Sequence, residues 1–156
     1  MPDSPQSLAD RLLVEGGRVI DFFNKLDATL WGKPAYAGED AWTFHELLAH
    51  LVSAEIGRSE LIAAIASGGS GAPPDFLIEE YNRSEVKKFS MDSDDSLLDR
   101  FWSERTRLAK LVGSLTLFDL TRLGNDPYLG SATLLEIIKL TYRHNQIHLR
   151  EIRGIR

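Results

Sequence analysis

The chain has 156 residues, of which 43% are hydrophobic and 26% are charged, and it contains no cysteine. This length and composition predict a single globular domain over residues 1–156 with its own hydrophobic core. The absence of cysteine excludes disulfides, thiolate metal ligands and a cysteine nucleophile. The net charge is −5 with no block of basic residues, so we expect no nucleic-acid partner, because such a surface needs clustered lysine or arginine.

No segment of the sequence indicates export or membrane insertion. Residues 1–7 lack a basic region followed by an apolar run, so no secretory signal is visible. No apolar stretch approaches the roughly 20 residues that a membrane-spanning helix needs. We therefore expect a cytoplasmic protein that has no membrane partner.

The first segment with helical periodicity runs from about Pro5 to Trp31. Ser4 is a suitable N-cap, and a proline fits the first position of a helix. Gly16 and Gly17 each weaken this helix by roughly 1 kcal/mol relative to alanine, so we expect close packing or a bend there. The apolar stripe of the segment recurs at helical spacing and consists of Leu8, Leu12, Val19, Phe22, Phe23, Leu26 and Leu30.

The second helix begins at a capping box. Thr43 and Glu46 have the spacing of that motif, and Trp42 and Leu47 have the spacing of a hydrophobic staple. The helix continues along an apolar stripe until the glycine-rich segment 67–71 ends it.

A long connection over residues 72–94 leads to the third long helix. Within it, residues 75–89 have room for a shorter helix. The third long helix runs over about residues 94–115, with leucine, valine and phenylalanine on one face. A loop rich in glycine, asparagine and aspartate then follows over residues 124–130.

The fourth long helix begins at a second capping box, formed by Thr133 and Glu136, and runs to Gly154. No strand pattern competes with these helices. The sequence therefore predicts an all-α four-helix bundle with a long connection between its second and third helices.

The fourth helix carries the most informative pair of residues, His144 and His148. Residues i and i+4 lie on one face of a helix, and two imidazoles placed in this way can bind one metal ion. At roughly 100° per residue, both histidines and Asn145 fall within the apolar arc, whereas Arg143 and Arg150 lie on the opposite side. Because a buried polar group is costly unless it is satisfied, these core-facing polar residues need an explanation. A metal site is the most specific one.

A third ligand is available on the second helix. His50 lies seven residues after Thr43, while His144 and His148 lie 11 and 15 residues after the cap of the fourth helix. If these two helices run alongside each other, the three side chains meet inside the bundle. Three protein ligands with one open position are typical of a catalytic zinc site. The alternative is that they are core histidines satisfied by hydrogen bonds. His45 lies about 140° around the helix from His50, so both cannot reach one ion.

Two further polar residues on the apolar arcs are candidate catalytic residues. Glu55 lies near the centre of the stripe of the second helix, where a carboxylate can orient a ligand histidine or act as a general base. The alternative for Glu55 is an ion pair with a core-facing arginine, Arg58 or Arg105. Asn145 can orient a substrate, or it can satisfy a backbone group.

Three segments of the chain resemble the DinB/YfiT-like superfamily, which also contains the bacillithiol S-transferases and the N-terminal domain of mycothiol-dependent maleylpyruvate isomerase. Residues 42–51, with the sequence WTFHELLAHL, are similar to the start of that family's second helix. Residues 144–152 resemble its HxxxHLxxI ending, and residues 78–82 are a weaker match. The likeness spans nearly the whole chain, and the combination is specific where each segment alone is not.

The resemblance implies a bundle that holds a divalent metal ion, zinc or nickel, through a histidine of the second helix and the HxxxH pair. These roles fall on His50, His144 and His148. It also implies a small-molecule substrate, a low-molecular-weight thiol that coordinates the metal, and a homodimer. The mycothiol-dependent isomerases carry an additional C-terminal domain, whereas this sequence ends at Arg156, so we do not expect the isomerase activity.

Three hypotheses for function follow. The first is a divalent-metal-dependent, thiol-dependent S-transferase, in which the metal holds a substrate thiol as the nucleophilic thiolate. The second is a metal-dependent hydrolase. The third is a non-catalytic homodimeric interaction bundle, whose interface would use aromatic residues such as Trp31, Tyr36 and Trp102.

Overall fold

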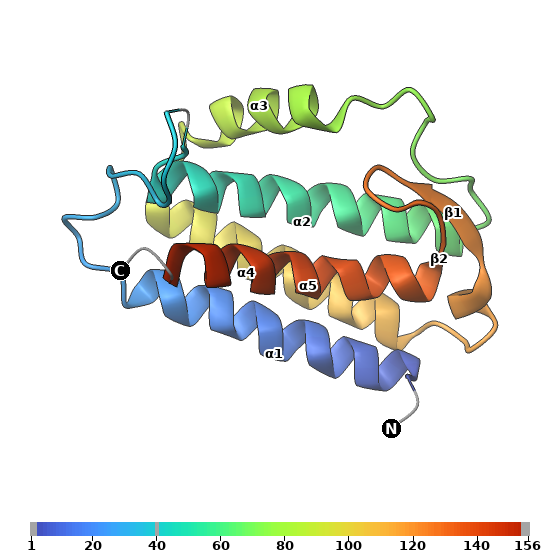
Figure 1. The fold of residues 1–156 in the computed structure, drawn as a ribbon. Coiled ribbons are helices and arrows are strands. Elements are labelled where there is room, and N and C mark those ends of the chain that lie inside the picture. The colour runs from blue at the N-terminus through green and yellow to red at the C-terminus, as the bar shows by residue number, and fades with distance from the viewer. Residues whose placement is uncertain (1–2, 40, 154–156) are drawn as a thin grey trace.

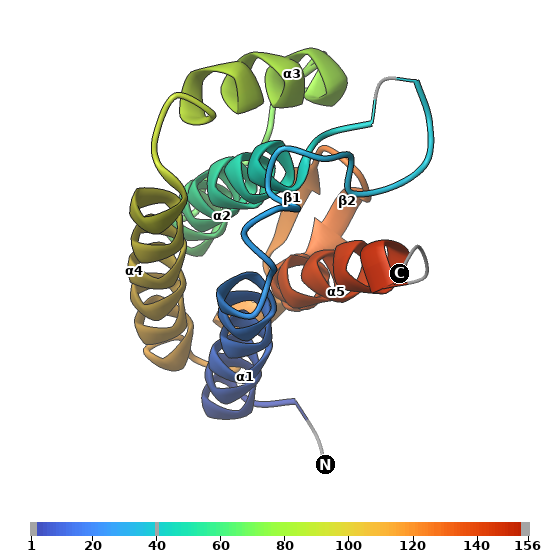
Figure 2. The ribbon, with the colours of Figure 1, turned by 90° about the vertical axis from the view of Figure 1, so that its left-hand side faces the viewer.

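Four long helices form a bundle in the computed structural model, which describes residues 3–39 and 41–153. The first of these long helices packs between the third and the fourth long helices, and the second packs between the same two on the opposite side (Figures 1 and 2). The predicted all-α four-helix bundle is therefore confirmed. No helix in the described ranges is long and apolar enough to cross a membrane. The bundle helices are α1 (Pro5–Asn24), α2 (Phe44–Ala66), α4 (Asp94–Gly113) and α5 (Leu134–Arg153).

The connection between α2 and α4 contains the shorter helix expected there, α3 (Ile78–Phe89), which lies against α2 outside the bundle (Figure 1). Between α4 and α5, a 3-10 turn leads into an antiparallel hairpin. The prediction of a plain loop, with no competing strands, is wrong here, because four-residue strands are too short to show a clear alternation in sequence. These elements are η1 (Asp119–Thr121), β1 (Leu123–Asp126) and β2 (Gly130–Thr133).

Both predicted capping boxes are formed. The backbone N–H of Glu46 donates to the hydroxyl of Thr43 at 3.1 Å, and the backbone N–H of Thr43 donates to the Glu46 carboxylate at 3.0 Å. Thr133 and Glu136 exchange the same two hydrogen bonds, each 3.2 Å long. The starts of α2 and α5, the helices that carry the histidines, are thus set by local hydrogen bonds.

The first helix is shorter than its apolar periodicity predicts, because it ends at Asn24 instead of near Trp31. The carboxylate of Asp27 accepts hydrogen bonds from the backbone N–H and the hydroxyl of Thr29 at 2.9 and 2.8 Å. Such a local turn competes with helical hydrogen bonding. Leu26 is still buried, so the apolar pattern predicted burial correctly and helix length incorrectly.

A charged group lies at the centre of the bundle. The side chain of Arg105, on α4, is completely buried. It donates to both carboxylate oxygens of Glu55 at 2.6 and 2.8 Å, and to the side-chain oxygen of Asn145 at 2.5 Å. It also donates to the backbone carbonyl of Leu12 at 2.9 Å. Because these partners belong to α2, α5 and α1, Arg105 connects all four helices of the bundle.

Gly16 makes room for this arginine, and its neighbour Gly17 does not. A Cβ atom added at Gly16 would lie 2.7 Å from Cγ of Arg105, whereas one added at Gly17 would meet nothing within 4 Å.

Gly16→Ala should therefore lower the free energy of unfolding by about 1–3 kcal/mol through overpacking. Gly17→Ala should raise it by about 0.5–1 kcal/mol, because alanine favours a helix interior over glycine. Urea titrations of both variants beside the parent protein measure the two effects. A Gly16→Ala variant as stable as Gly17→Ala would contradict the placement of Arg105 against α1.

Candidate metal centre

The three predicted ligand histidines come together between α2 and α5. These helices run antiparallel (Figure 1), so His50, in the second turn of α2, lies level with His144 and His148 in the later part of α5. One ring nitrogen from each histidine lies within 4.8 Å of those of the other two. The Nε2 atoms of His144 and His148 are 3.0 Å apart. The spacing within one helix and the packing of two helices thus create a single cluster of imidazoles.

The cluster is enclosed by the protein, most completely at His50. His50 is 2% exposed, and the ring of Trp42 lies against it with the ring centroids 4.6 Å apart. Trp42 therefore does more than the stapling role that its position in the sequence predicts. The side chain of His148 is 15% exposed, so solvent reaches the cluster at His148 and not at His50.

Two buried ring nitrogens of the cluster lack a hydrogen-bond partner among the described residues. They are Nδ1 of His50 and Nδ1 of His148. The carboxylate of Glu151 lies 3.6 Å from the second of these, which is too far for a hydrogen bond. Buried polar atoms are almost always satisfied, so the unpaired nitrogen of His50 indicates a partner that the described residues do not supply. His148 faces His144 through Nε2, so its unpaired Nδ1 is not the atom that meets the other two histidines.

Burial lowers the pKa of each histidine in the cluster. It lowers the pKa of His50 to about 3, with a smaller contribution from the nearby positive charge of His148. It lowers the pKa of His144 well below its usual value of 6.5, and the two neighbouring histidines act in the same direction. The pKa of His148 is lowered by burial and is partly restored by the carboxylate of Glu151. The three imidazoles are therefore neutral at physiological pH, which is the form that binds metal ions.

The donor set fits a divalent transition metal ion. Imidazole nitrogen is a good ligand for zinc and for nickel. Two nitrogens bound to one tetrahedral zinc ion lie about 3.3 Å apart, given Zn–N bonds of about 2.0–2.1 Å. The separation of 3.0 Å between His144 and His148 is close to that value. Three histidines leave at least one coordination position for a substrate.

Glu55 and Asn145, the predicted catalytic residues, lie in the Arg105 network. Both carboxylate oxygens of Glu55 accept hydrogen bonds from Arg105, and the side-chain oxygen of Asn145 accepts a third. Glu55 is 2% exposed and Asn145 is 3% exposed. For Glu55 the geometry thus favours the alternative that the sequence left open, an ion pair with Arg105. Asn145 bonds to the same guanidinium instead of the backbone group considered for it, and both side chains lie in the core of the bundle.

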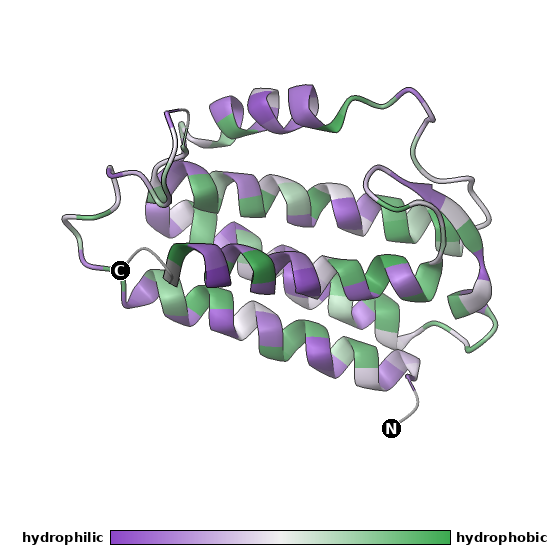
Figure 3. Ribbon diagram, in the orientation of Figure 1, coloured by the Kyte–Doolittle hydropathy of each residue, from purple (hydrophilic) through white to green (hydrophobic). Residues whose placement is uncertain are grey.

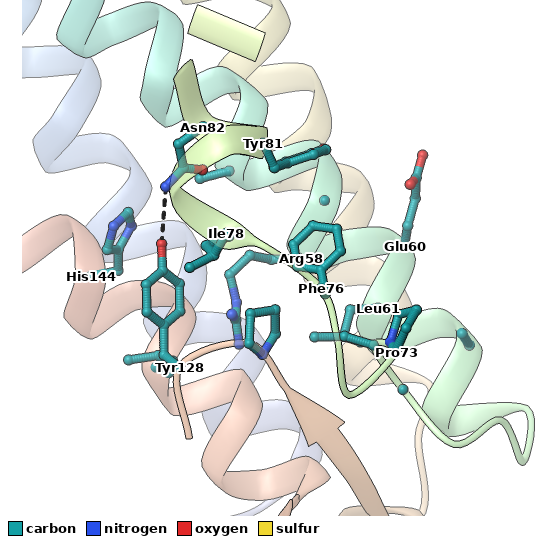
Figure 4. A pocket seen from close by; sticks show the side chains of 17 residues that line it. Arg58, Glu60, Leu61, Pro73, Phe76, Ile78, Tyr81, Asn82, Tyr128 and His144 are labelled. Carbon is teal, nitrogen blue, oxygen red and sulfur yellow. Dashed lines mark hydrogen bonds between the residues drawn. The ribbon is translucent and has the colours of Figure 1, made fainter. Parts of the chain in front are cut away.

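Two contacts near the histidines were not predicted. Tyr128, between the two strands of the hairpin, has its ring centroid 6.2 Å from that of His144, and its hydroxyl accepts a hydrogen bond from Asn82 of α3 at 3.3 Å (Figure 4). Arg58, buried on α2, forms an ion pair with Asp126 at 2.7 Å. No spacing rule in the sequence relates the hairpin to α2 or α5, so neither contact had a signal there.

The lowered histidine pKa values predict that the metal-free protein is sensitive to acid. Unfolded imidazoles titrate near pH 6.5, whereas the folded cluster has lower pKa values, so the unfolded state binds more protons between these values. The contribution of these histidines to the free energy of unfolding should therefore be complete above about pH 6.5. It should decrease as the pH falls, by up to about 1.4 kcal/mol per pH unit for each histidine. Urea titrations at pH 7, 6 and 5 with a chelator measure this slope, and His50→Gln should flatten it.

His45→Gln provides the control, because the pKa of His45 shifts in the opposite direction. Burial lowers its pKa, but hydrogen bonds to the carboxylate of Asp94 and the carbonyl of Ser90 outweigh burial and raise it. Its contribution is present below the unfolded pKa and is lost as the pH rises through its folded pKa. His45→Gln should therefore lower the free energy of unfolding by a constant amount below about pH 6.5, with a smaller effect as the pH rises through the folded pKa, and it should leave the acid slope intact. An acid slope that is the same in His50→Gln would contradict the buried neutral histidine.

Comparisons with known proteins agree with this architecture. Residues 11–152 match the DinB superfamily. YfiT from Bacillus subtilis, described as a probable metal-dependent hydrolase with an unusual four-helix bundle topology, superposes with a TM-score of 0.78 at 15% sequence identity. That alignment covers 99% of this chain and 90% of YfiT. A comparison with curated proteins found no significant match.

Two further solved structures share the fold. The mycothiol-dependent maleylpyruvate isomerase has a TM-score of 0.78 and 15% identity, and the alignment covers 96% of this chain and 61% of the isomerase. This chain therefore spans about three fifths of the isomerase. The colibactin self-resistance protein ClbS, solved in complex with a dsDNA, has a TM-score of 0.64 and 19% identity over 99% of this chain and 98% of ClbS. At these identities the likeness concerns the fold, and it is the sequence match over residues 11–152 that makes this chain a member of the DinB superfamily.

Proposed function

We propose that this protein is a metal-dependent enzyme in which His50, His144 and His148 hold one divalent ion, zinc or nickel, and that it acts on a small-molecule substrate. The observation that carries the proposal is the meeting of three neutral, largely buried imidazoles with one nitrogen from each within 4.8 Å of the others. When bound, such an ion lowers the pKa of a coordinated thiol or water molecule and so supplies a nucleophile at neutral pH.

The protein contributes position and a dry environment. Trp42 packs against His50 and restricts its ring, while the turn between His144 and His148 places these two side chains on one face of α5. Tyr128 lies beside His144 with its hydroxyl available as a hydrogen-bond donor to a substrate, because that oxygen accepts its hydrogen bond from Asn82. A substrate at the cluster would thus meet three imidazoles and one hydroxyl.

Thiol-dependent S-transfer is the reaction that we propose first. The chain has no cysteine, so the thiol comes from a low-molecular-weight co-substrate. Its sulfur forms a bond to an electrophilic carbon, the leaving group departs with the bonding electron pair, and the thiol proton passes to solvent. Similarity of fold to a mycothiol-dependent isomerase supports a thiol co-substrate by analogy only.

Metal-dependent hydrolysis is the second candidate reaction, and the likeness to YfiT, a probable metal-dependent hydrolase, favours it by the same kind of analogy.

The expected homodimer is also part of the proposal, and sedimentation equilibrium tests it. With a net charge of −5, the chain is expected not to bind DNA, which an electrophoretic mobility shift assay checks.

Metal content tests the ligand assignment. Protein purified without an affinity tag or chelator should contain about one zinc or nickel ion per chain by elemental mass spectrometry. His50→Ala, His144→Ala and His148→Ala should each lose it, because two remaining imidazoles rarely hold an ion tightly.

His45→Ala is the matched control for this measurement. It removes a histidine from the same helix as His50, but the side chain of His45 bonds to Asp94 and Ser90 instead, so the metal should be retained. Stoichiometric metal in His148→Ala would rule out this ligand set. A parent protein that holds no metal and takes none up on titration would support the interaction-bundle hypothesis.

A chelator should also lower the melting temperature of the parent protein, because a ligand that binds only the folded state stabilises it by mass action. A ligand present at about 100 times its dissociation constant adds about 2.7 kcal/mol. Differential scanning fluorimetry with and without EDTA measures the shift. The His144→Ala variant should show none, and an equal shift in that variant would mean that the chelator acts elsewhere.

A further inference from the structure

A chamber of about 330 Å³ adjoins the histidine cluster, with His144 in its wall. Side chains of α2, α3, α5 and the hairpin surround it, together with the segment that leads from α2 to α3 (Figure 4). Small-molecule sites usually measure about 300–1,000 Å³, so the chamber has the size of such a site. Its apolar lining includes Leu61, Pro73, Phe76, Ile78, Tyr81 and Leu140.

The wall that faces α2 is anchored to the hairpin by the backbone. Gly71 has a φ of +93°, and a Cβ there would lie 2.5 Å from backbone atoms of Asn125, so this close approach requires glycine. The backbone N–H of Ala72 donates to the carbonyl of Asn125 at 2.8 Å, and the side-chain amide of Asn125 donates to the carbonyl of Ala72 at 2.8 Å. These bonds fix the start of the segment that carries Pro73 and Phe76, so the chamber is part of the folded structure.

The described side chains that line the chamber offer no unpaired cation to an anionic ligand. Among the described lining residues, Arg58 is the only cation, and its guanidinium is paired with Asp126 at 2.7 Å and bonded to the carbonyl of Ile137 at 3.2 Å. Glu60 is exposed, and its carboxylate points away from the other labelled side chains in Figure 4. A carboxylate or phosphate inside the chamber would lose hydration without gaining a cationic side chain as its partner.

Polar groups gather at the end of the chamber next to the histidines. There the hydroxyl of Tyr128 accepts its hydrogen bond from Asn82 at 3.3 Å, close to the ring of His144 (Figure 4). At the opposite side, the rings of Phe76 and Tyr81 lie with their centroids 5.2 Å apart, a surface on which a planar ring packs well. The chamber is therefore polar at one end and apolar over the rest.

We propose that this chamber binds the uncharged, apolar part of the substrate, a group of the size of a small aromatic ring system. The reacting group of that substrate then faces His144 and Tyr128. This inference rests on the proposed metal-dependent function and adds the substrate class, which is a compound with an uncharged, largely apolar body.

Two fluorescent probes with the same aromatic body test the charge preference. N-phenyl-1-naphthylamine is neutral, and 1-anilinonaphthalene-8-sulfonate carries one sulfonate. Metal-free protein should bind the neutral probe more tightly by about tenfold or more, because the sulfonate finds no free cation in the chamber. Equal affinities, tighter binding of the sulfonate, or binding of neither probe would overturn the inference.

Filling the chamber tests the location. Gly57 lies in the wall, where an added Cβ would be 3.5 Å from the hydroxyl of Tyr81. Gly57→Leu should weaken the binding of the neutral probe by about fivefold or more, because the larger side chain reduces the volume of the chamber. Gly17→Leu is the matched control, because it also replaces a helical glycine, at a position outside the chamber where an added Cβ would meet nothing within 4 Å, and it should leave the affinity unchanged. Ala64→Leu, also in the wall, serves if circular dichroism shows that Gly57→Leu does not fold.

Unchanged affinity for the neutral probe in a folded chamber variant would place the probe elsewhere and overturn the inference. Metal content measured on each preparation before the metal is removed, and after metal is added back, separates this inference from the proposed function. Stoichiometric metal without selective probe binding contradicts the substrate class alone. Selective, chamber-dependent probe binding in a protein that takes up no metal supports the chamber and contradicts the metal-dependent function alone.

Discussion

The buried ion pair between Arg105 and Glu55 is the interaction on which the rest of this structure depends. The guanidinium of Arg105, on α4, bonds to Glu55, Asn145 and the carbonyl of Leu12, and so connects α4 to the other three bundle helices. A buried charge that loses its partner costs several kcal/mol, so arrangements in which α2 or α5 slides along the bundle are disfavoured. Because Glu55 follows His50 on α2, and Asn145 directly follows His144 on α5, the register that satisfies Arg105 also brings the histidines level.

The bundle therefore contains two polar clusters that differ in how they are satisfied. In the Arg105 network, each Glu55 oxygen and the Asn145 side-chain oxygen accept a hydrogen bond from inside the protein. In the histidine cluster, two buried nitrogens have no partner among the described residues. A closed network stabilises one arrangement of helices, whereas an open one has capacity left for a ligand. This contrast supports a structural role for Glu55 and a binding role for His50.

The elements outside the bundle supply the other half of the proposed site. Helix α3, the segment after Gly71 and the hairpin enclose the chamber on the side of α2 and α5 that carries His144. Arg58 and Asp126 hold the hairpin against α2 by an ion pair, which also neutralises the one cation among the described lining residues. The bundle thus provides the histidine cluster, and the added elements form most of the chamber beside it.

Local features of the sequence were sufficient to predict the helix starts and the histidine pair. A capping box acts within one turn, as at Thr43 and Thr133, and the i, i+4 spacing of His144 and His148 has the same consequence in any helix. The end of α1 was predicted wrongly, because the turn at Asp27 overrides an apolar periodicity that continues past it. The sequence also left two partners open for Glu55.

Only the tertiary structure decided these questions, because they depend on which segments become neighbours. Arg105 is the partner of Glu55 because α4 packs against α2. Tyr128 lies beside His144 because the hairpin lies close to α5. The chamber likewise exists only where α2, α3, α5 and the hairpin meet. The sequence by itself determined where the long helices begin and which residues are able to bind a metal. The packing of distant segments determined which polar groups are paired and which are left for a ligand.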